Sequence, residues 1–278
     1  MSLNTAILTY HSQNISGSTT GDNDHIALKQ DLEALHAAGF RVIPLAQVID
    51  YLDAGVEGDR LRATVCLTFD DGCDFDVEDI DYPGFGIQRS FLGILQDFIG
   101  EHGENAQPSL HATSFVIASD EARDTIDARS LFGKGWISDD WWQEQAKGKL
   151  ISIDNHGWDH NHPDLTSNGD KETRGGFHSV DTLEQCQKQV LQAADFIERK
   201  TGTRPDLFAY PFGESSQFIR QQFFAQGMAN HGCRAALGTD AGKVTQESDR
   251  WNLPRYVCGR DWQTPEQLLR ICNSQNTC

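Results

Sequence analysis

The sequence predicts an α/β fold in which about seven parallel strands close into a barrel. Short apolar runs alternate with segments of helical periodicity along the whole chain, which is the pattern of repeated strand–helix units. No repeat, low-complexity tract or linker divides the 278 residues, so we expect a single domain over residues 1–278. Seven strands in one domain of this length favour a barrel over an open sheet.

Seven apolar runs have the length of buried strands. They span residues 6–10, 41–45, 64–69, 111–118, 150–153, 207–210 and 233–237. Apolar residues recur at helical spacing in four further segments, which are residues 25–38, 87–99, 181–202 and 215–227. Gly39 and Gly202 lie where the first and third of these helices would end, a position that favours glycine.

The composition excludes some classes of partner. A net charge of −18 argues against binding to nucleic acid or to an anionic membrane, since both require positive charge on the protein. No run approaches the roughly 20 apolar residues of a membrane span. The N-terminus shows no signal peptide, which predicts a cytoplasmic protein, or a periplasmic or secreted one if a leader was removed. Seven cysteines without CxxC spacing predict reduced thiols, although Cys272 and Cys278 could pair in an oxidising environment.

Polar clusters directly follow four of the predicted strands. These clusters are Tyr10-His11, Asp70-Asp71-Gly72, residues 154–165 and residues 210–214. Functional loops in parallel α/β folds follow the C-terminal ends of strands, where neighbouring loops lie close together. We therefore expect the four clusters to form one site.

The third cluster holds three histidines within seven residues, His156, His160 and His162. His156 and His160 are four residues apart, so in a helical or tightly turned segment both imidazoles face one way. Two neutral imidazoles and one carboxylate form a common catalytic metal set that leaves positions open for water and substrate. We expect metal ligands here, against the alternative that the histidines only decorate a polar loop.

Asp70 and Asp71 lie side by side after a buried strand, where two carboxylates repel one another. One of them can ligate a metal ion while the other acts as a general base on metal-bound water. A cation beside the pair would also relieve the repulsion. The alternative is that the Asp-Asp-Gly sequence only opens a turn.

These residues resemble the polysaccharide deacetylases, carbohydrate esterase family four. The family's T-F-D-D motif is present as Thr68-Phe69-Asp70-Asp71, its His-x-x-x-His motif as residues 156–160, and its Pro-aromatic-Gly turn as residues 211–213. The motifs occur in the family's order. The early "TYH" and the late "LPRY" (residues 253–256) resemble the branch that deacetylates poly-N-acetylglucosamine and related glycans.

The resemblance implies a distorted (β/α) barrel and a role for each matching position. Asp70 would be the general base, and Asp71, His156 and His160 would hold the metal ion. A backbone N–H near Phe212 would help to stabilise the oxyanion. Tyr210 and Pro211 would lie beside the substrate with it, unless this turn serves packing alone.

The chain departs from the family pattern at three points. The Arg that often precedes the third motif is absent, and Arg255 would replace it in orienting Asp70, unless it pairs with a surface acid. The family's late Leu-x-His has no counterpart, so His11 is the expected general acid, with a strand-end His bonded to backbone as the alternative. The spacing after His160 leaves His162 as the runner-up ligand.

Two further features would shape the cleft. Trp158 and Trp262 are candidates for stacking on sugar rings, with core packing as the alternative. The acidic loop at residues 73–86 would form a wall of the cleft or bind a cationic product, or else be an ordinary solvated loop.

The expected function is therefore that of a metal-dependent hydrolase that removes N-acetyl groups, or in second place O-acetyl groups, from a glycan or small sugar. Zinc is the expected cofactor, and cobalt, nickel or iron(II) suit the same ligands. The alternatives are a hydrolase of another linear amide, such as a ureide, and a catalytically silent glycan-binding protein. The sequence predicts no oligomeric state.

Overall fold

The structure is a computed structural model that describes residues 3–54, 61–165 and 174–274. Its centre is one curved sheet in the strand order β10-β1-β3-β6-β7-β8-β9, with β11 paired to β1 and β2 paired to β3. The bounds are β1 (Thr5–Tyr10), β2 (Arg41–Val42), β3 (Thr64–Phe69), β6 (Ala112–Val116), β7 (Ile151–Asn155), β8 (Leu207–Ala209), β9 (Ala235–Leu237), β10 (Lys243–Val244) and β11 (Tyr256–Val257). Every pairing is parallel except that of β10 with β1. The predicted α/β class and distorted barrel are confirmed, and each of the seven apolar runs contributes a strand.

A short segment near the end of the chain bridges the two sides of the barrel. Leu253 forms an isolated parallel bridge to Leu237 of β9, and β11 pairs in parallel with Leu8 and Thr9 of β1. The segment 253–257 therefore lies between β1 and β9. Arg255 stands in its middle and is completely buried.

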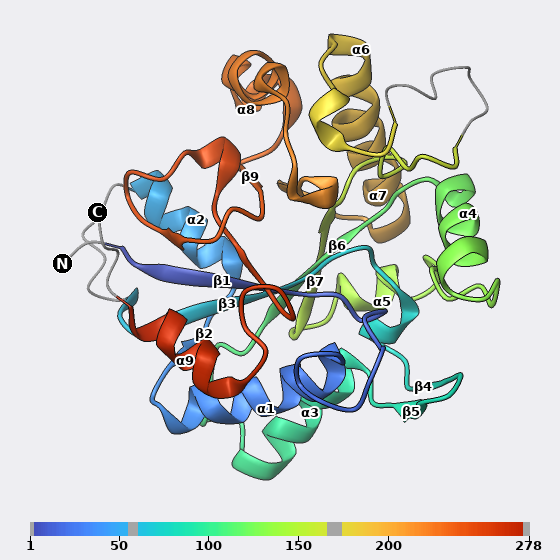
Figure 1. Cartoon of the computed structure of the whole chain (residues 1–278). Helices are drawn as coiled ribbons and strands as arrows, with labels where there is room; N and C mark the ends of the chain where they lie inside the picture. The colour runs from blue at the N-terminus through green and yellow to red at the C-terminus, as the bar shows by residue number, and fades with distance from the viewer. Residues whose placement is uncertain (1–2, 55–60, 166–173, 275–278) are drawn as a thin grey trace.

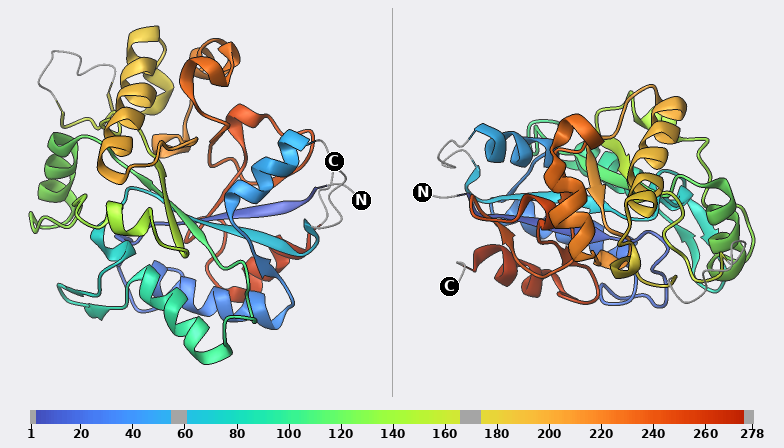
Figure 2. Two further views of the ribbon diagram at one scale, coloured as in Figure 1. Left: turned by 180° about the vertical axis from the view of Figure 1, so that it is seen from behind. Right: turned by 90° about the horizontal axis from the view of Figure 1, so that it is seen from above.

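Helices cover the strands on the outside (Figure 1). Their bounds are α1 (Asp24–Ala37), α2 (Leu45–Ala54), α3 (Phe91–His102), α4 (Asp120–Ser130), α5 (Trp142–Gln145), α6 (Leu183–Cys186), α7 (Ala193–Thr201), α8 (Met228–His231) and α9 (Pro265–Asn273). Helices α1, α3 and α9 pack side by side on one side of the sheet. The two further views in Figure 2 show the strands running through the middle of the molecule with helices around them.

The helical predictions are correct in place but differ in detail. Helix α3 begins at Phe91 rather than at residue 87, because the Ser90 side chain caps it by accepting from the Gly93 N–H. The predicted helix 181–202 consists of α6, a π-helix at Gln187–Gln192, and α7. In the segment 215–227, the structure forms a π-helix at Ile219–Phe223 and a 3-10 turn at Phe224–Gln226. Helix α4 carries too few apolar residues to show a helical period in the sequence.

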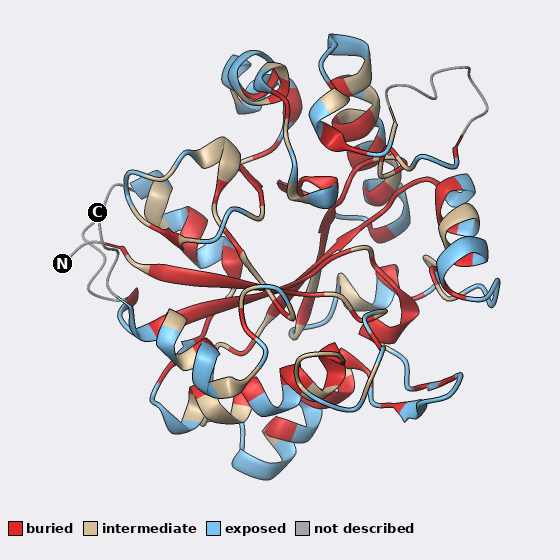
Figure 3. Cartoon of the chain, viewed as in Figure 1, coloured by how far each residue is buried: buried red, intermediate tan, exposed pale blue. Residues whose placement is uncertain are grey.

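The core has an inner and an outer layer, because successive side chains of a strand point to opposite faces. One cluster packs inside the barrel and includes Ile7, Cys66 and Phe115. Another packs between the strands and the helices and includes Leu8 and Leu67. Both faces of β1 and β3 are buried, as expected of parallel strands. Figure 3 shows buried strands in the middle and helices that expose only their outer faces.

The acidic loop at residues 73–86 is not an ordinary solvated loop. Asp74 and Asp76 are buried in a 3-10 turn, and Asp76 accepts hydrogen bonds from Ser12 Oγ at 2.6 Å and Ser114 Oγ at 2.7 Å. The rest of the loop forms a two-stranded hairpin, β4 (Ile80–Tyr82) with β5 (Gly86–Gln88). The sequence prediction missed this hairpin because each strand has only three residues, too few to show a strand period.

The described cysteines carry free thiols. Six are buried and unpaired, at positions 66, 73, 186, 233, 258 and 272. Cys278 lies outside the described residues, and with it the expected pairing to Cys272.

The structure predicts that Gly72 tolerates no side chain. Gly72 has a φ of +70°, and an added Cβ would lie 2.7 Å from Val116 Cγ1 and 3.1 Å from Val116 Cα. We expect Gly72→Ala to destabilise the fold by about 2–4 kcal/mol, measured by urea unfolding, because strain adds to overpacking. Gly39→Ala is the matched control, since Gly39 has a φ of +80° with nothing within 4 Å, and it should cost about 1 kcal/mol. Equal losses in the two variants would contradict the packing argument.

Candidate active site

Three side chains from two loops converge at the C-terminal ends of the strands. Asp71 follows β3, while His156 and His160 follow β7. Asp71 Oδ1 lies 3.4 Å from His156 Nε2 and 3.3 Å from His160 Nε2. The three residues can each offer one ligand atom within 4.8 Å of the others. The predicted carboxylate and two imidazoles are thus brought together.

Each imidazole presents its Nε2 to Asp71, and for His156 the structure supplies a reason. His156 Nδ1 lies 2.9 Å from the Ala209 carbonyl oxygen, so it carries the proton and donates it. Nε2 of the neutral ring is then a lone-pair donor that faces Asp71 Oδ1. This tautomer is the one that a metal ligand requires, and the three residues therefore fit a divalent metal ion.

The backbone is strained where these side chains converge. Asp71 has a φ of 79°, His160 of 55°, Asn161 of 45° and Phe212 of 60°, all in the left-handed region that non-glycine residues rarely adopt. Ala63 and Phe132 are the other non-glycine residues with positive φ in the described part of the chain. Such strain persists only where surrounding contacts hold it, and it gathers at functional sites.

Asp159 holds the strained His160 loop in place. Its carboxylate accepts from Lys188 Nζ at 2.8 Å, from Gln189 Nε2 at 2.5 Å and from Arg174 Nη2 at 3.2 Å. Gln189 Oε1 in turn accepts from the Trp158 backbone N–H at 2.9 Å. Lys188 and Gln189 are consecutive residues of the π-helix at Gln187–Gln192, which allows both side chains to reach the loop.

Asp70 forms a buried ion pair with Arg255. The two carboxylate oxygens accept from Arg255 Nη1 and Nη2, each at 2.8 Å, with Asp70 3 % exposed and Arg255 fully buried. Burial raises the pKa of Asp70, but Arg255, followed by His156, lowers it by more, so the net pKa lies below the ordinary value. Arg255 also donates to the Gly238 carbonyl and to Thr68 Oγ1, which fixes the guanidinium.

Gln13 contacts Asp71, and the sequence gave no indication of this contact. It lies in the loop after β1, and its Nε2 donates to Asp71 Oδ2, the oxygen that does not face the histidines. Its Oε1 accepts from Cys73 Sγ at 3.5 Å. A lone Gln in a polar loop carries no sequence signal, so only the fold reveals this contact.

His11 lies at the same end of the barrel, one residue after β1. It is close enough to Asp70 to lower that residue's pKa. Its backbone N–H donates to the Asp24 carboxylate at 2.7 Å, which anchors the residue. Its Nδ1 is buried and has no hydrogen-bond partner among the described residues, so the imidazole retains an uncommitted nitrogen.

The turn after β8 places one side chain at the candidate site and two in the interior of the protein. The Phe212 ring is 44 % exposed and lies edge-on to His160, with ring centroids 4.4 Å apart. Pro211 is buried. Tyr210 is also buried and donates its hydroxyl to the Trp251 carbonyl at 2.7 Å. Of the three residues of this turn that were predicted to lie beside the substrate, only Phe212 presents its side chain at the site.

Three other predicted contacts lie apart from the metal cluster. The Trp158 ring packs edge-on against Phe196 of α7, which favours core packing. Trp262 is buried and donates to Asp31 Oδ2 at 2.8 Å. His162 is absent from the ligand group found among the described residues, and its Nδ1 accepts from the Asp164 backbone N–H at 3.3 Å. The cluster therefore contains His160 rather than the runner-up.

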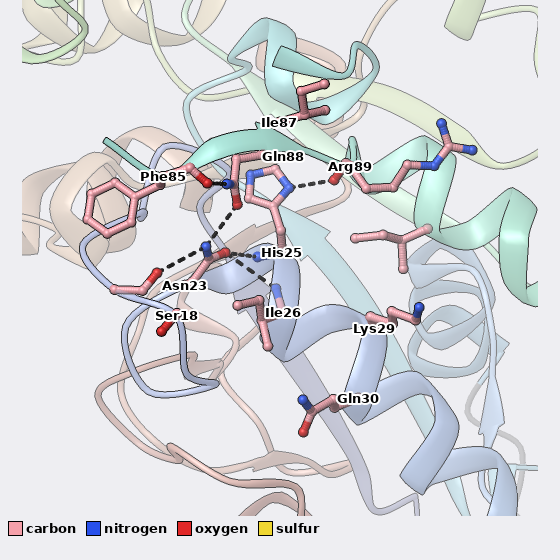
Figure 4. Close-up of a pocket in the computed structure, with 12 residues that line it drawn as sticks. Ser18, Asn23, His25, Ile26, Lys29, Gln30, Phe85, Ile87, Gln88 and Arg89 are labelled. Carbon is pink, nitrogen blue, oxygen red and sulfur yellow. Dashed lines mark hydrogen bonds between the residues drawn. The ribbon is translucent and has the colours of Figure 1, made fainter. Parts of the chain in front are cut away.

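A cavity of about 300 Å³ lies between the start of α1 and the β4–β5 hairpin (Figure 4). Phe85 and Ile87 of the hairpin line it with exposed apolar surface. Its polar groups bond mainly to one another: Asn23 donates to Gln88 Oε1 at 2.9 Å, and His25 Nδ1 lies 2.7 Å from the Arg89 carbonyl. His25 Nε2 also lies 2.8 Å from the Ser12 carbonyl oxygen, so the lining of this cavity contacts the loop that carries His11 and Gln13.

We expect Gln13→Ala to weaken metal binding by about 10-fold or more, because outer partners of a ligand orient it. The measurement is the dissociation constant of Zn²⁺ by competition with a chromophoric chelator. Gln47→Ala, an exposed change on α2, is the control and should leave the constant unchanged. An unchanged constant in Gln13→Ala would show that the contact with Asp71 has no influence on the metal.

Comparison with known proteins agrees with this geometry. Residues 106–231 match the family model described as polysaccharide deacetylase. The matched segment contains His156, His160 and Phe212, whereas Asp70, Asp71 and Arg255 lie outside it. No curated protein matches the sequence. No helix in the described ranges has the length and apolar character to cross a membrane.

Several solved structures share the fold. The chain is similar to the deacetylase PplD of Streptococcus pyogenes, solved in complex with acetate, with a TM-score of 0.66 and 16% identity over 99% of this chain and 100% of that one. It is also similar to IcaB of Ammonifex degensii (TM-score 0.64, 16% identity, 98% and 97% covered). A third similar structure is the de-N-acetylase of Aggregatibacter actinomycetemcomitans, with a TM-score of 0.62 and 12% identity over 96% of this chain and 99% of that one. Residues 106–231 thus carry the pattern of the polysaccharide deacetylase family, within a chain whose fold matches these structures over nearly its full length.

Proposed function

We propose that the protein is a metal-dependent hydrolase that removes N-acetyl groups from a carbohydrate. The observation that carries the proposal is the Asp70–Arg255 ion pair directly beside the Asp71–His156–His160 cluster. Asp71 faces two imidazoles, whereas its sequence neighbour Asp70 is paired with a guanidinium. The two adjacent carboxylates thus have different environments, which suits them to different roles.

Asp71, His156 and His160 would hold the metal ion, which when bound polarises the acetamide carbonyl and activates a water molecule. Asp70 would accept a proton from that water as general base. Arg255 keeps Asp70 ionised and fixes both of its oxygens, so the carboxylate meets the water in one orientation. The sequence expectation for Arg255, a partner of Asp70, agrees with this geometry.

The remaining roles fall to the loops after β1 and β8. The backbone N–H of Phe212 would stabilise the developing oxyanion, because the left-handed φ of 60° turns this peptide away from the regular path of the strand. His11, which follows β1 at the same end of the barrel, would return a proton to the leaving amine. The metal ion would be zinc, since zinc suits two imidazoles and a carboxylate.

The substrate class rests on the family match and on the names of the similar structures. The matched model is that of polysaccharide deacetylases, and one similar structure is named a de-N-acetylase. We therefore propose an N-acetylated glycan or small sugar as substrate. A silent binding protein would have no need of an oriented base, whereas here Asp70 is held at both oxygens.

We expect Asp70→Asn to retain the metal ion and to lower kcat/KM for acetate release from N-acetylglucosamine oligomers by about 10²-fold or more, the usual range for a general base. Metal content, measured by plasma mass spectrometry, separates this variant from Asp71→Asn, which should lose both metal and activity. Full activity in Asp70→Asn would overturn the assignment of the base.

Replacing Arg255 should shift the pH dependence. Protonated Asp70 cannot accept a proton, so activity falls as the pH drops through the pKa of Asp70. Arg255 is the largest influence that lowers this pKa. We therefore expect the acidic limb of the kcat/KM profile to move to higher pH in Arg255→Met and by less in Arg255→Lys. The exposed pair of Arg260 with Asp261 offers Arg260→Met as a control with an unshifted profile.

Removal of the metal tests the cluster as a whole. Dialysis against a strong chelator should abolish acetate release, and Zn²⁺ or Co²⁺ should restore it, because both ions suit the ligand set. The fold should survive this treatment, since Asp71 and His156 are also held by hydrogen bonds to Gln13 and to the Ala209 carbonyl. Full activity in the metal-free protein would remove the metal from the mechanism.

A further inference from the structure

The first residues after β1 form a tight turn at the candidate active site. The Asn14 N–H donates to the His11 carbonyl oxygen at 2.9 Å, which is the hydrogen bond of a β-turn. Ser12 and Gln13 are therefore the two central residues of this turn. Gln13 Nε2 donates to Asp71 Oδ2, and His11 is the proposed general acid. The conformation of one turn thus determines where two residues of the site lie.

Ser12 anchors this turn in the interior of the protein. It is completely buried, and its Oγ donates to Asp76 Oδ1 at 2.6 Å. Its carbonyl oxygen lies 2.8 Å from His25 Nε2, so its backbone is held as well. Gln13, the next residue in the turn, is only partly buried. The position of Gln13 therefore depends on the contacts of its buried neighbour.

Asp76 joins the turn to a neighbouring strand. It lies in the 3-10 turn Asp74–Asp76, is completely buried, and accepts at Oδ2 from Ser114 Oγ of β6 at 2.7 Å. A buried carboxyl group is costly without hydrogen bonds, so Asp76 requires the hydroxyl groups of both serines. Strand β6 lies between β3 and β7, the two strands that the candidate metal ligands follow. Asp76 thus ties the turn after β1 to the edge of the sheet that carries the metal cluster.

The 3-10 turn that carries Asp76 is itself firmly held. The Asp74 N–H donates to the Trp136 carbonyl oxygen at 2.9 Å. Asp74 Oδ1 accepts from the Ser138 backbone N–H at 2.9 Å and from Trp141 Nε1 at 3.1 Å. These contacts fix the backbone two residues before Asp76, so its carboxyl group is an acceptor with a defined position.

We propose that Asp76 is a positioning residue of the candidate active site, which acts through Ser12. It fixes the turn at residues 11–14, so that Gln13 reaches Asp71 and His11 keeps its place after β1. A group that orients a metal ligand needs support of its own, and Asp76 supplies that support one step further out. The effect on His11 rests on the proposed function, whereas the effect on Gln13 concerns the metal cluster alone.

Zinc binding tests the path from Ser12 to Gln13. We expect Ser12→Ala to raise the dissociation constant of Zn²⁺, measured by competition with a chromophoric chelator, by about 3-fold to 10-fold. In the Gln13→Ala background the same change should have no further effect, because the residue that Ser12 positions has lost its amide. An unchanged constant in Ser12→Ala, or the same factor in both backgrounds, would overturn the proposal.

Four further variants separate positioning from stability. Ser114→Ala removes the other hydrogen bond of Asp76, so it should lower stability to urea as Ser12→Ala does but weaken zinc binding by a smaller factor. Asp76→Asn keeps an oxygen for Ser12 and should retain the zinc affinity within about 2-fold, whereas Asp76→Ala should weaken it at least as much as Ser12→Ala. Ser16→Ala, an exposed change in the same loop, should alter neither property, because Ser16 Oγ contacts only the Asp22 carbonyl. Zinc affinity that falls in proportion to stability across these variants would show a purely structural role and overturn the proposal; if Asp76→Ala does not fold, the Ser12 variants decide.

Acetate release tests the effect on His11. At saturating Zn²⁺, Ser12→Ala should lower kcat about 3-fold or more with KM nearly unchanged, since a displaced general acid slows the chemical step. In a His11→Ala background, Ser12→Ala should lower kcat no further. An unchanged kcat in Ser12→Ala would overturn the effect on His11. The zinc measurements need no turnover, so a lack of acetate release from the unaltered protein would count against the proposed function alone.

Discussion

The structure depends on how one buried negative charge is balanced. Asp70 is removed from water beside a second carboxylate, and an ionised group in that position is costly unless it is paired and hydrogen-bonded. The bidentate contact with Arg255 meets this requirement, and the segment 253–257 places that arginine inside the barrel. The sheet pairing, the buried guanidinium and the ionised base are therefore parts of one arrangement. The charge of Asp71 is balanced separately: two imidazoles face its Oδ1, and Gln13 donates a hydrogen bond to its Oδ2.

Rigidity and strain are combined in the candidate site. The strands deliver Asp71, His156 and the Phe212 turn to one edge, and their buried faces give that edge little freedom. Within the loops after these strands, the backbone adopts a positive φ at Asp71, His160 and Phe212, outside the regions that non-glycine residues favour. Neighbouring elements hold these conformations, and the Asp159 contacts to the π-helix are the clearest example. A pre-organised arrangement of this kind lowers the reorganisation needed when a substrate binds.

Much of the fold and part of the site could be predicted from sequence, for physical reasons. Buried parallel strands are continuous apolar runs, so β3 was predicted over its full range, and residues that end such strands must share an edge. The contact of Arg255 with Asp70 was anticipated only through a family resemblance. Gln13 and the burial of Asp76 could not be predicted, because each depends on a loop meeting a distant segment. The roles of Tyr210 and Trp262 could not be decided from the sequence, because the same aromatic residue types stack on sugars and fill cores.

The position of Arg255 also bears on the order in which the molecule folds. Asp70 and Arg255 are 185 residues apart in the chain, whereas β1 and β3 can pair across a much shorter loop. Contacts of such long sequence separation require more chain entropy to be given up before they form. We therefore expect the half-barrel to assemble first, with its interior open, and the segment 253–257 to dock last. During synthesis the oriented base would then exist only after the C-terminal segment has left the ribosome, so a nascent or truncated chain would be compact before it is competent.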